Sequence, residues 1–114
     1  MKRNRPTRFY SNKQEKQIAK AVGGRKTANS GATAFNKGDV TTDLFLIEAK
    51  TCMESKKSFS IKKEWIEKNK EEAFAVGKYY SALAFNFGPD EPNYYIIDER
   101  LFKHLNELLE GEEQ

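Results

Sequence analysis

The 114-residue chain is 38% hydrophobic and 32% charged, a composition that predicts one folded domain with a single core and leaves no room for a second. No run approaches the ~20 consecutive apolar residues of a membrane span, and no apolar stretch follows the basic N-terminus as a signal peptide would require. The net charge of +3 is unevenly distributed, because residues 1–26 carry +8 and the remainder carries −5, the pattern expected of a protein that binds a polyanion.

The predicted domain occupies residues 11–110, between a flexible basic arm at 1–10 and a frayed acidic tail at 111–114. A single cysteine, Cys52, excludes an internal disulfide and favours a reducing compartment, so we expect a cytoplasmic protein. Its compactness would suit a viral or mobile-element protein.

The first predicted helix begins with a capping box formed by Ser11 and Gln14. It continues to about Val22 and ends at Gly23-Gly24, because glycine readily adopts the conformation that closes a helix. Glu15 falls on the apolar face of this helix, together with Ile18, Ala19 and Val22.

A β-hairpin is predicted over about 38–51, after a loop or short strand within 23–36. Its second strand begins with the apolar run Leu44–Ile47, typical of a covered strand, and ends in Glu48-Ala49-Lys50. If the turn centres between Asp43 and Leu44, Asp39 lies opposite Glu48 on one face of the sheet. Two facing carboxylates repel each other, and a divalent cation is the natural group to lie between them.

The rest of the chain predicts two helices and two strands. The helices cover about 61–76, with Ser60 as N-cap, and 99–110, with Asp98 as N-cap; the strands cover 79–87 and 93–97. Core positions are predicted at Ile61, Trp65, Ala73, Val76, Leu101, Leu105 and Leu108. The complete order, α-β-β-β-α-β-β-α, predicts an α/β fold with a mixed sheet flanked by helices.

The hairpin carries residues suited to phosphodiester hydrolysis. Asp39 and Glu48 could bind Mg²⁺, and the backbone carbonyl of Ala49 could supply a third oxygen. Lys50 shares the face of Glu48, where it could orient or deprotonate the attacking water or steady the phosphate. An exposed surface ion pair is the structural alternative for these residues.

Asp39 followed by Glu48-Ala49-Lys50 across a hairpin resembles the signature of the PD-(D/E)XK nucleases. The wider arrangement resembles the archaeal-type Holliday junction resolvases of that superfamily. Those proteins begin with a helix carrying a glutamate, matched by Glu15, followed by a Gly-rich turn and a Ser-Gly loop, matched by Gly23-Gly24-Arg25 and Ser30-Gly31. The likeness extends over roughly residues 11–87.

This resemblance implies a restriction-endonuclease-like fold and a homodimer that cuts branched DNA with Mg²⁺, for which Mn²⁺ is expected to substitute. It implies a catalytic set of Glu15, Asp39, Glu48 and Lys50, with Glu15 as a further candidate metal ligand. The family usually has proline before the aspartate, whereas this chain has Gly38, so Asp43 is an alternative ligand. A turn at Asp43 favours Asp39, since Asp43 then lies far from Glu48.

Basic residues that could contact DNA phosphates cluster before and within the hairpin region. Ser30 would lie near the scissile phosphate, by resemblance. The candidate DNA-binding residues are Arg3, Arg5, Arg8, Arg25, Lys26, Ser30, Lys37 and Lys62. A solubilising tail or a solvated helix start would have the same composition. His104 has no evident partner in the sequence and is expected at the surface.

The favoured function is a metal-dependent endonuclease of the junction-resolvase type. Flaps, nicked duplexes or replication intermediates are alternative substrates. A non-catalytic nucleic-acid-binding module with the same fold is the main alternative, because fold does not determine function. A protein-interaction subunit has only the aromatic composition in its favour.

Overall fold

The computed structural model describes residues 7–27 and 39–112. These form an α/β fold in which a five-stranded mixed sheet is combined with three helices, so the predicted fold class is confirmed. The elements, in chain order, are α1 (Thr7–Val22), β1 (Arg25–Lys26), β2 (Val40–Thr41), β3 (Phe45–Lys50), α2 (Lys63–Ala75), β4 (Tyr80–Phe85), β5 (Tyr94–Ile96) and α3 (Glu99–Glu112). None of the helices in these segments is long and apolar enough to cross a membrane.

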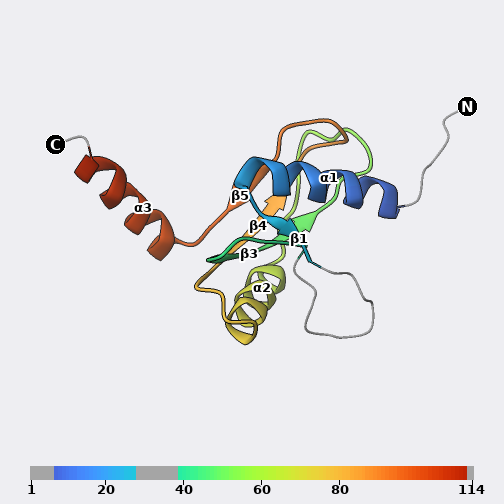
Figure 1. Cartoon of the computed structure of the whole chain (residues 1–114). Coiled ribbons are helices and arrows are strands. Elements are labelled where there is room, and N and C mark those ends of the chain that lie inside the picture. The colour runs from blue at the N-terminus through green and yellow to red at the C-terminus, as the bar shows by residue number, and fades with distance from the viewer. Residues whose placement is uncertain (1–6, 28–38, 113–114) are drawn as a thin grey trace, which may run out of the picture.

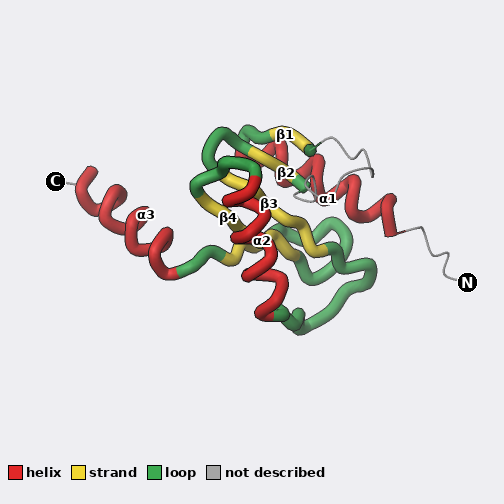
Figure 2. The backbone as a smooth tube through the Cα atoms, turned by 90° about the horizontal axis from the view of Figure 1, so that it is seen from below, coloured by secondary structure: helices red, strands yellow, loops and turns green. Residues whose placement is uncertain are grey.

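The strands lie in the order β1-β2-β3-β4-β5. The central pair, β3 and β4, is parallel, and every other neighbouring pair is antiparallel. Helix α1 covers one face of the sheet and α2, which connects the two parallel strands, covers the other (Figures 1 and 2). The sheet is therefore enclosed between two helices, with β3 and β4 at its centre.

The β2–β3 hairpin has the predicted register. Val40 pairs with Ile47 and Thr41 with Leu46, so the turn centres between Asp43 and Leu44. The Thr42 hydroxyl oxygen accepts hydrogen bonds from the backbone N–H groups of Leu44 and Phe45, which fixes this turn. Continuing the register by one residue places Asp39 opposite Glu48.

The main core lies between α1 and the sheet. Its buried side chains belong to α1, the hairpin and β4: Ile18, Val40, Ile47, Ala82 and Ala84. Side chains alternate along a strand, so the buried Leu46 and Leu83 face the opposite side, where α2 packs. The predicted core position Ala73 is buried there, whereas Val76 is 38% exposed, so that prediction is wrong.

Both predicted helix N-caps before the last helix are wrong. Helix α1 begins at Thr7, so residues 7–10 of the predicted arm are helical, and the Ser11 hydroxyl instead donates to the Arg8 carbonyl. Helix α2 begins after Lys62, which makes no side-chain cap, rather than after Ser60. The predicted helix ends are confirmed, because Gly23 (φ +70°) and Gly77 (φ +79°) adopt the left-handed conformation.

Helix α3 begins as predicted but does not pack as predicted. The Asp98 carboxylate accepts a hydrogen bond from Leu101 N–H at 2.9 Å and pairs with Lys70 of α2 at 2.9 Å. Leu101 is buried, yet Leu105 and Leu108 are 38% and 52% exposed, because α3 extends away from the sheet after its first turn (Figure 1). The helix includes Gly111, which was predicted to belong to a frayed tail.

Candidate active site

Asp39 lies within electrostatic range of two other carboxyl groups where α1 passes the start of the β2–β3 hairpin. Asp39 lies immediately before β2, Glu48 lies in β3, and Glu15 comes from the middle of α1. The negative charges of Glu15 and Glu48 both act on Asp39. The structure therefore brings near one another acids that are up to 33 residues apart in the sequence, the separation of Glu15 and Glu48.

Asp39 is held by the backbone of the neighbouring strand. Its Oδ2 atom accepts a hydrogen bond from the Ala49 N–H at 2.7 Å. Burial raises the pKa of Asp39 to about 7; the Ala49 hydrogen bond opposes this, and the charges of Glu15 and Glu48 reinforce it. This contact uses the N–H of Ala49, whereas the sequence suggested a role for its carbonyl.

Glu15 contacts both an acid and a base. Its pKa is raised, principally by burial, while Lys26 and a hydrogen bond with Asp39 act in the opposite direction. The Lys26 Nζ atom lies 3.7 Å from the Glu15 carboxylate. Two carboxyl groups that hydrogen-bond to each other must share a proton or a cation, since both cannot ionise at close range without cost.

Lys50 is enclosed by Glu48 and an aromatic ring. Its Nζ atom lies 2.8 Å from Glu48 Oε2, and the two side chains are only 23% and 16% exposed. The same nitrogen lies 4.2 Å from the centre of the Trp65 ring, a cation–π distance. Trp65, predicted as a core residue, is half-buried and bounds the site; its position at the start of α2 gave no signal of that contact.

Gln14 is a second residue whose role was missed. It is 2% exposed and donates to the Lys50 carbonyl and to Asn93 Oδ1, at 3.2 and 3.1 Å. Its own carbonyl oxygen accepts from the Thr51 hydroxyl at 2.9 Å. Gln14 thus links α1 to the end of β3 by hydrogen bonds and helps to fix the position of Glu15 relative to the hairpin. The spacing of Gln14 and Ile18, four residues apart on one helix face, was the available signal for its burial.

The predicted DNA-binding residues separate into three groups. Lys26 lies at the acid cluster, the charge of Arg8 also acts on Glu15, and Lys62 Nζ lies 5.9 Å from the Trp65 ring. Arg25 instead lines an apolar groove at the opposite end of the hairpin, with Asp43. Four predicted residues lie outside the described part of the chain: Arg3, Arg5, Ser30 and Lys37.

The carboxyl groups do not form a complete metal cage. Within residues 7–27 and 39–112, no three His, Cys, Asp or Glu side chains form a group that could hold a metal ion by themselves. Mg²⁺ is often bound by only one or two carboxylates, with water and substrate phosphate completing its shell. The carboxylates of Asp39 and Glu48 are of the chemical type that such a cation uses.

Comparisons with protein-family models, with curated proteins and with solved structures find no match. Function is therefore inferred from the geometry and chemistry of the site.

Proposed function

We propose that this protein is a metal-dependent endonuclease that cuts branched DNA. The observation that carries the proposal is the half-buried Asp39, whose pKa is raised to about 7 by burial and by the nearby charges of Glu15 and Glu48, beside the Glu48–Lys50 pair. Half-buried acids that repel one another destabilise the folded state, and groups with shifted pKa values are concentrated at functional sites. A divalent cation would relieve this repulsion.

The arrangement of strands supports the same proposal. The acids lie on a hairpin whose second strand, β3, pairs in parallel with β4, and α1 carries Glu15 to its start. This placement agrees with the resemblance to restriction-endonuclease-like folds, in which the acid hairpin belongs to a mixed sheet.

Each site residue has a proposed role. Asp39 and Glu48 would bind Mg²⁺ or Mn²⁺, and Glu15 would orient Asp39 or add a ligand through water. When bound, the cation would lower the pKa of a coordinated water and offset charge on the phosphate. Lys50 would leave Glu48 and turn its ammonium group toward the phosphate or the attacking water, while Trp65 limits the positions open to it.

Basic side chains around the acids would hold the DNA backbone. Lys26 and Arg8 approach the site from the α1 side, and Lys62 approaches from the start of α2. Cations on both sides of an acidic centre would compensate the repulsion between DNA phosphates and the carboxylates.

Cleavage by matched variants tests this function. Asp39→Asn and Glu48→Gln should each lower Mg²⁺-dependent cleavage of a synthetic four-way junction by at least ~100-fold, because each loses a charged ligand. Asp43→Asn is the matched control; it changes an exposed acid of the same hairpin and should cleave normally. DNA binding, measured in Ca²⁺, should survive in all three. If Asp39→Asn cleaves normally and Asp43→Asn does not, the metal ligand is Asp43 and the proposed role of Asp39 is wrong.

The substrate class needs its own comparison. Junctions, flaps, nicked duplex and linear duplex of equal length and sequence should be cleaved at different rates, with the branched forms preferred. Equal rates on linear duplex would remove the branched-DNA part of the proposal and leave the nuclease part intact.

A non-catalytic nucleic-acid-binding module is the second candidate. It is favoured by the direct Glu48–Lys50 ion pair and by the absence of a three-acid group among the described residues. Calorimetric titration with Mn²⁺ separates the two functions. An endonuclease should bind Mn²⁺ in a manner that Asp39→Asn weakens, whereas a binding module should show no such site.

A further inference from the structure

Two aromatic side chains near the end of α2 are largely uncovered. Phe74 is 87% exposed and Tyr79 is 74% exposed, the two highest values among the large hydrophobic side chains of the described segments. Within these segments neither ring stacks on another aromatic ring. Burial of such a ring stabilises a fold, so rings left in water contribute little to packing and point to a surface with a partner.

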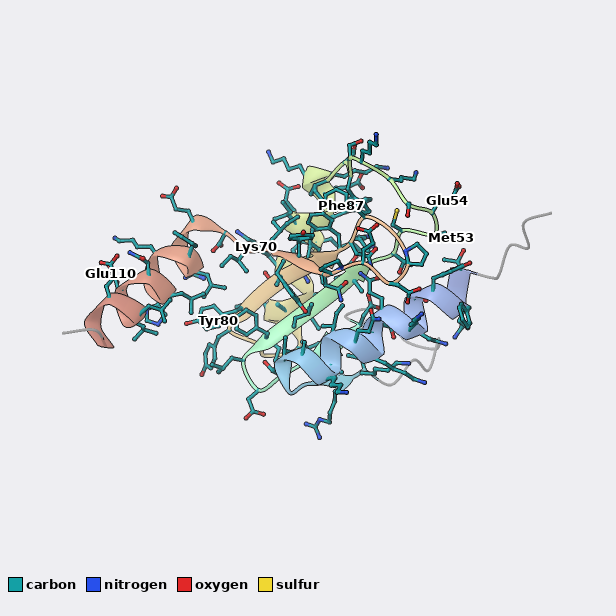
Figure 3. All side chains as sticks on the ribbon, turned by 90° about the horizontal axis from the view of Figure 1, so that it is seen from above. Met53, Glu54, Lys70, Tyr80, Phe87 and Glu110 are labelled. Carbon is teal, nitrogen blue, oxygen red and sulfur yellow. The ribbon has the colours of Figure 1, made fainter. Side chains whose placement is uncertain are left out.

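Both rings border a pocket of about 320 Å³ between the end of α2, the start of β4 and the first turn of α3. Two of its lining residues, Lys70 and Tyr80, lie at the end of the sheet from which α3 extends, whereas Glu54, which follows β3, lies at the other end (Figure 3). Tyr80 pairs with Phe45, five residue steps before Lys50, so the pocket lies about 17 Å from the Lys50 end of β3. It is therefore separate from the candidate active site.

The pocket is positively charged. Three of its lining side chains are cations, Lys70, Lys78 and Arg100, and one is an acid, Asp98. Lys70 pairs with Asp98 at 2.9 Å, whereas Lys78 Nζ donates to two backbone carbonyls of the β2–β3 turn, at 2.7 and 3.5 Å.

Neither Lys78 nor Arg100 forms an ion pair with a residue of the described segments. Arg100 acts on Asp98 only through its more distant charge, and the carbonyls bonded to Lys78 carry no net charge. Two cations of the pocket are thus left without a carboxylate of their own, an arrangement that suits an anionic ligand.

Uncovered rings beside unpaired cations are the two parts of a nucleotide site. An aromatic ring stacks on any base, and cations beside it hold the phosphate. An acidic peptide would use the cations but would not need two uncovered rings. An enclosed small molecule usually has about 70–90% of its surface buried by its pocket, whereas Phe74 and Tyr79 lie at the open surface, where successive bases of a chain can pass.

We propose that this pocket binds unpaired nucleotides of a single-stranded nucleic acid. The bases stack on the rings of Phe74 and Tyr79, and the adjoining phosphate lies near Lys78 and Arg100. In a duplex the faces of the bases are covered by their neighbours, so the site selects unpaired strands. The inference does not depend on the proposed endonuclease activity, because it uses none of the residues of the candidate active site.

Fluorescence anisotropy of the full chain with a labelled oligothymidylate of about 12 nucleotides tests the site. EDTA in the buffer prevents metal-dependent cleavage, so binding alone is measured. Phe74→Ala and Tyr79→Ala should each weaken binding about 5–100-fold, because each removes a stacking surface. Both side chains are largely exposed, so both variants should fold, which circular dichroism checks.

Tyr95→Ala is the matched control, since it removes a 40% exposed tyrosine that pairs with Ala84 on the α1 side of the sheet. It should bind the strand like the wild type. Wild-type affinity in either Phe74→Ala or Tyr79→Ala overturns the proposal.

Three probes separate base stacking from attraction between charges. The ratio of wild-type to Tyr79→Ala affinity should be large for the single strand and near one for a duplex of equal length and for an oligoglutamate of equal charge. An equal ratio for the duplex or for the oligoglutamate rules out a site for unpaired nucleotides.

The salt dependence of single-strand binding tests the phosphate contact. Arg100→Gln should lower the slope of log K against log salt concentration by about 0.7, the value expected for one lost phosphate contact to a single strand. Lys20→Gln, exposed on α1 across the sheet, should leave the slope unchanged. Equal slopes for Arg100→Gln and the wild type would contradict the phosphate contact.

Discussion

Asp39 Oδ2 lies 2.7 Å from the backbone nitrogen of Ala49, so a main-chain donor of β3 holds the acid that precedes β2. The carboxyl group keeps this orientation whatever side chains occupy positions 48 and 50. One of its oxygens is thereby committed, and the other is left for a ligand or for the carboxyl group of Glu15.

The pH dependence of stability should reveal the cost of this acid. Because the folded-state pKa of Asp39 is raised to about 7 from 3.8, the contribution of this group to stability is greatest below 3.8 and is lost as the pH rises toward about 7. Asp39→Asn keeps an oxygen for Ala49 N–H and carries no charge. In metal-free buffer its free energy of unfolding should match the wild type near about pH 4 and exceed it by about 1–3 kcal/mol near about pH 8. Urea titrations at both pH values measure this, and an advantage independent of pH would contradict the assignment.

Trp65 should position Lys50 through its ring. Trp65→Leu removes the cation–π contact, worth about 0.5–2 kcal/mol, and should slow junction cleavage about 3–10-fold with little change in DNA affinity. Trp65→Phe keeps an aromatic face and should restore most of the rate. Single-turnover cleavage and equilibrium binding separate the two effects. Equal rates for Leu and Phe would indicate that Trp65 serves packing alone.

Gln14 should matter more to stability than an ordinary surface glutamine. Gln14→Ala removes the hydrogen-bond partner of the Lys50 carbonyl and of the Thr51 hydroxyl and empties a buried position, so it should cost about 1–3 kcal/mol. Gln17→Ala, on the exposed face of the same helix, is the matched control and should be near neutral. Chemical unfolding measures both, and equal effects would contradict the buried role.

Two glycines should respond to alanine in opposite directions. A Cβ at Gly24 would lie 2.6 Å from the Thr41 carbonyl oxygen, so Gly24→Ala should separate β1 from β2 and lower stability by about 1–3 kcal/mol. A Cβ at Gly111 meets nothing within 4 Å, and Gly111→Ala in the helix should stabilise by up to about 1 kcal/mol. Thermal melts provide the comparison. An unchanged melting temperature for Gly24→Ala would contradict the close approach of Gly24 to Thr41.

The hairpin was predictable because its pattern and its turn are local. The register of Val40 with Ile47 follows from the position of the turn, and helix ends at Gly23 and Gly77 follow from backbone conformation. The packing of α3 was not predictable, because a periodic apolar stripe shows that a helix needs cover without showing what provides it. Leu105 and Leu108 have that pattern, yet the helix leaves the sheet before reaching either position.

The site was predictable to the same extent. Strand alternation and the hairpin register place Asp39, Glu48 and Lys50 on one face, and Glu15 approaches Asp39 from α1. The roles of Trp65 and Gln14 were not predicted, because their contacts with Lys50 of β3 join residues 15 and 36 positions apart in the sequence. Such contacts depend on how the helices pack on the sheet. Arg25 was placed with Lys26 by proximity in the chain, whereas alternation along β1 sends its side chain to a different surface.

The local register of the hairpin has a consequence for assembly. Asp39 and Glu48 are nine residues apart, so little loop entropy opposes their approach, whereas β3 and β4 pair across 35 residues. The pairing of β2 with β3, which brings Asp39 and Glu48 together, thus closes the shortest loop in the sheet. The parallel pairing of β3 with β4 closes a longer loop. We therefore expect a divalent cation present during refolding to act at the hairpin, raising the folding rate more than it lowers the unfolding rate.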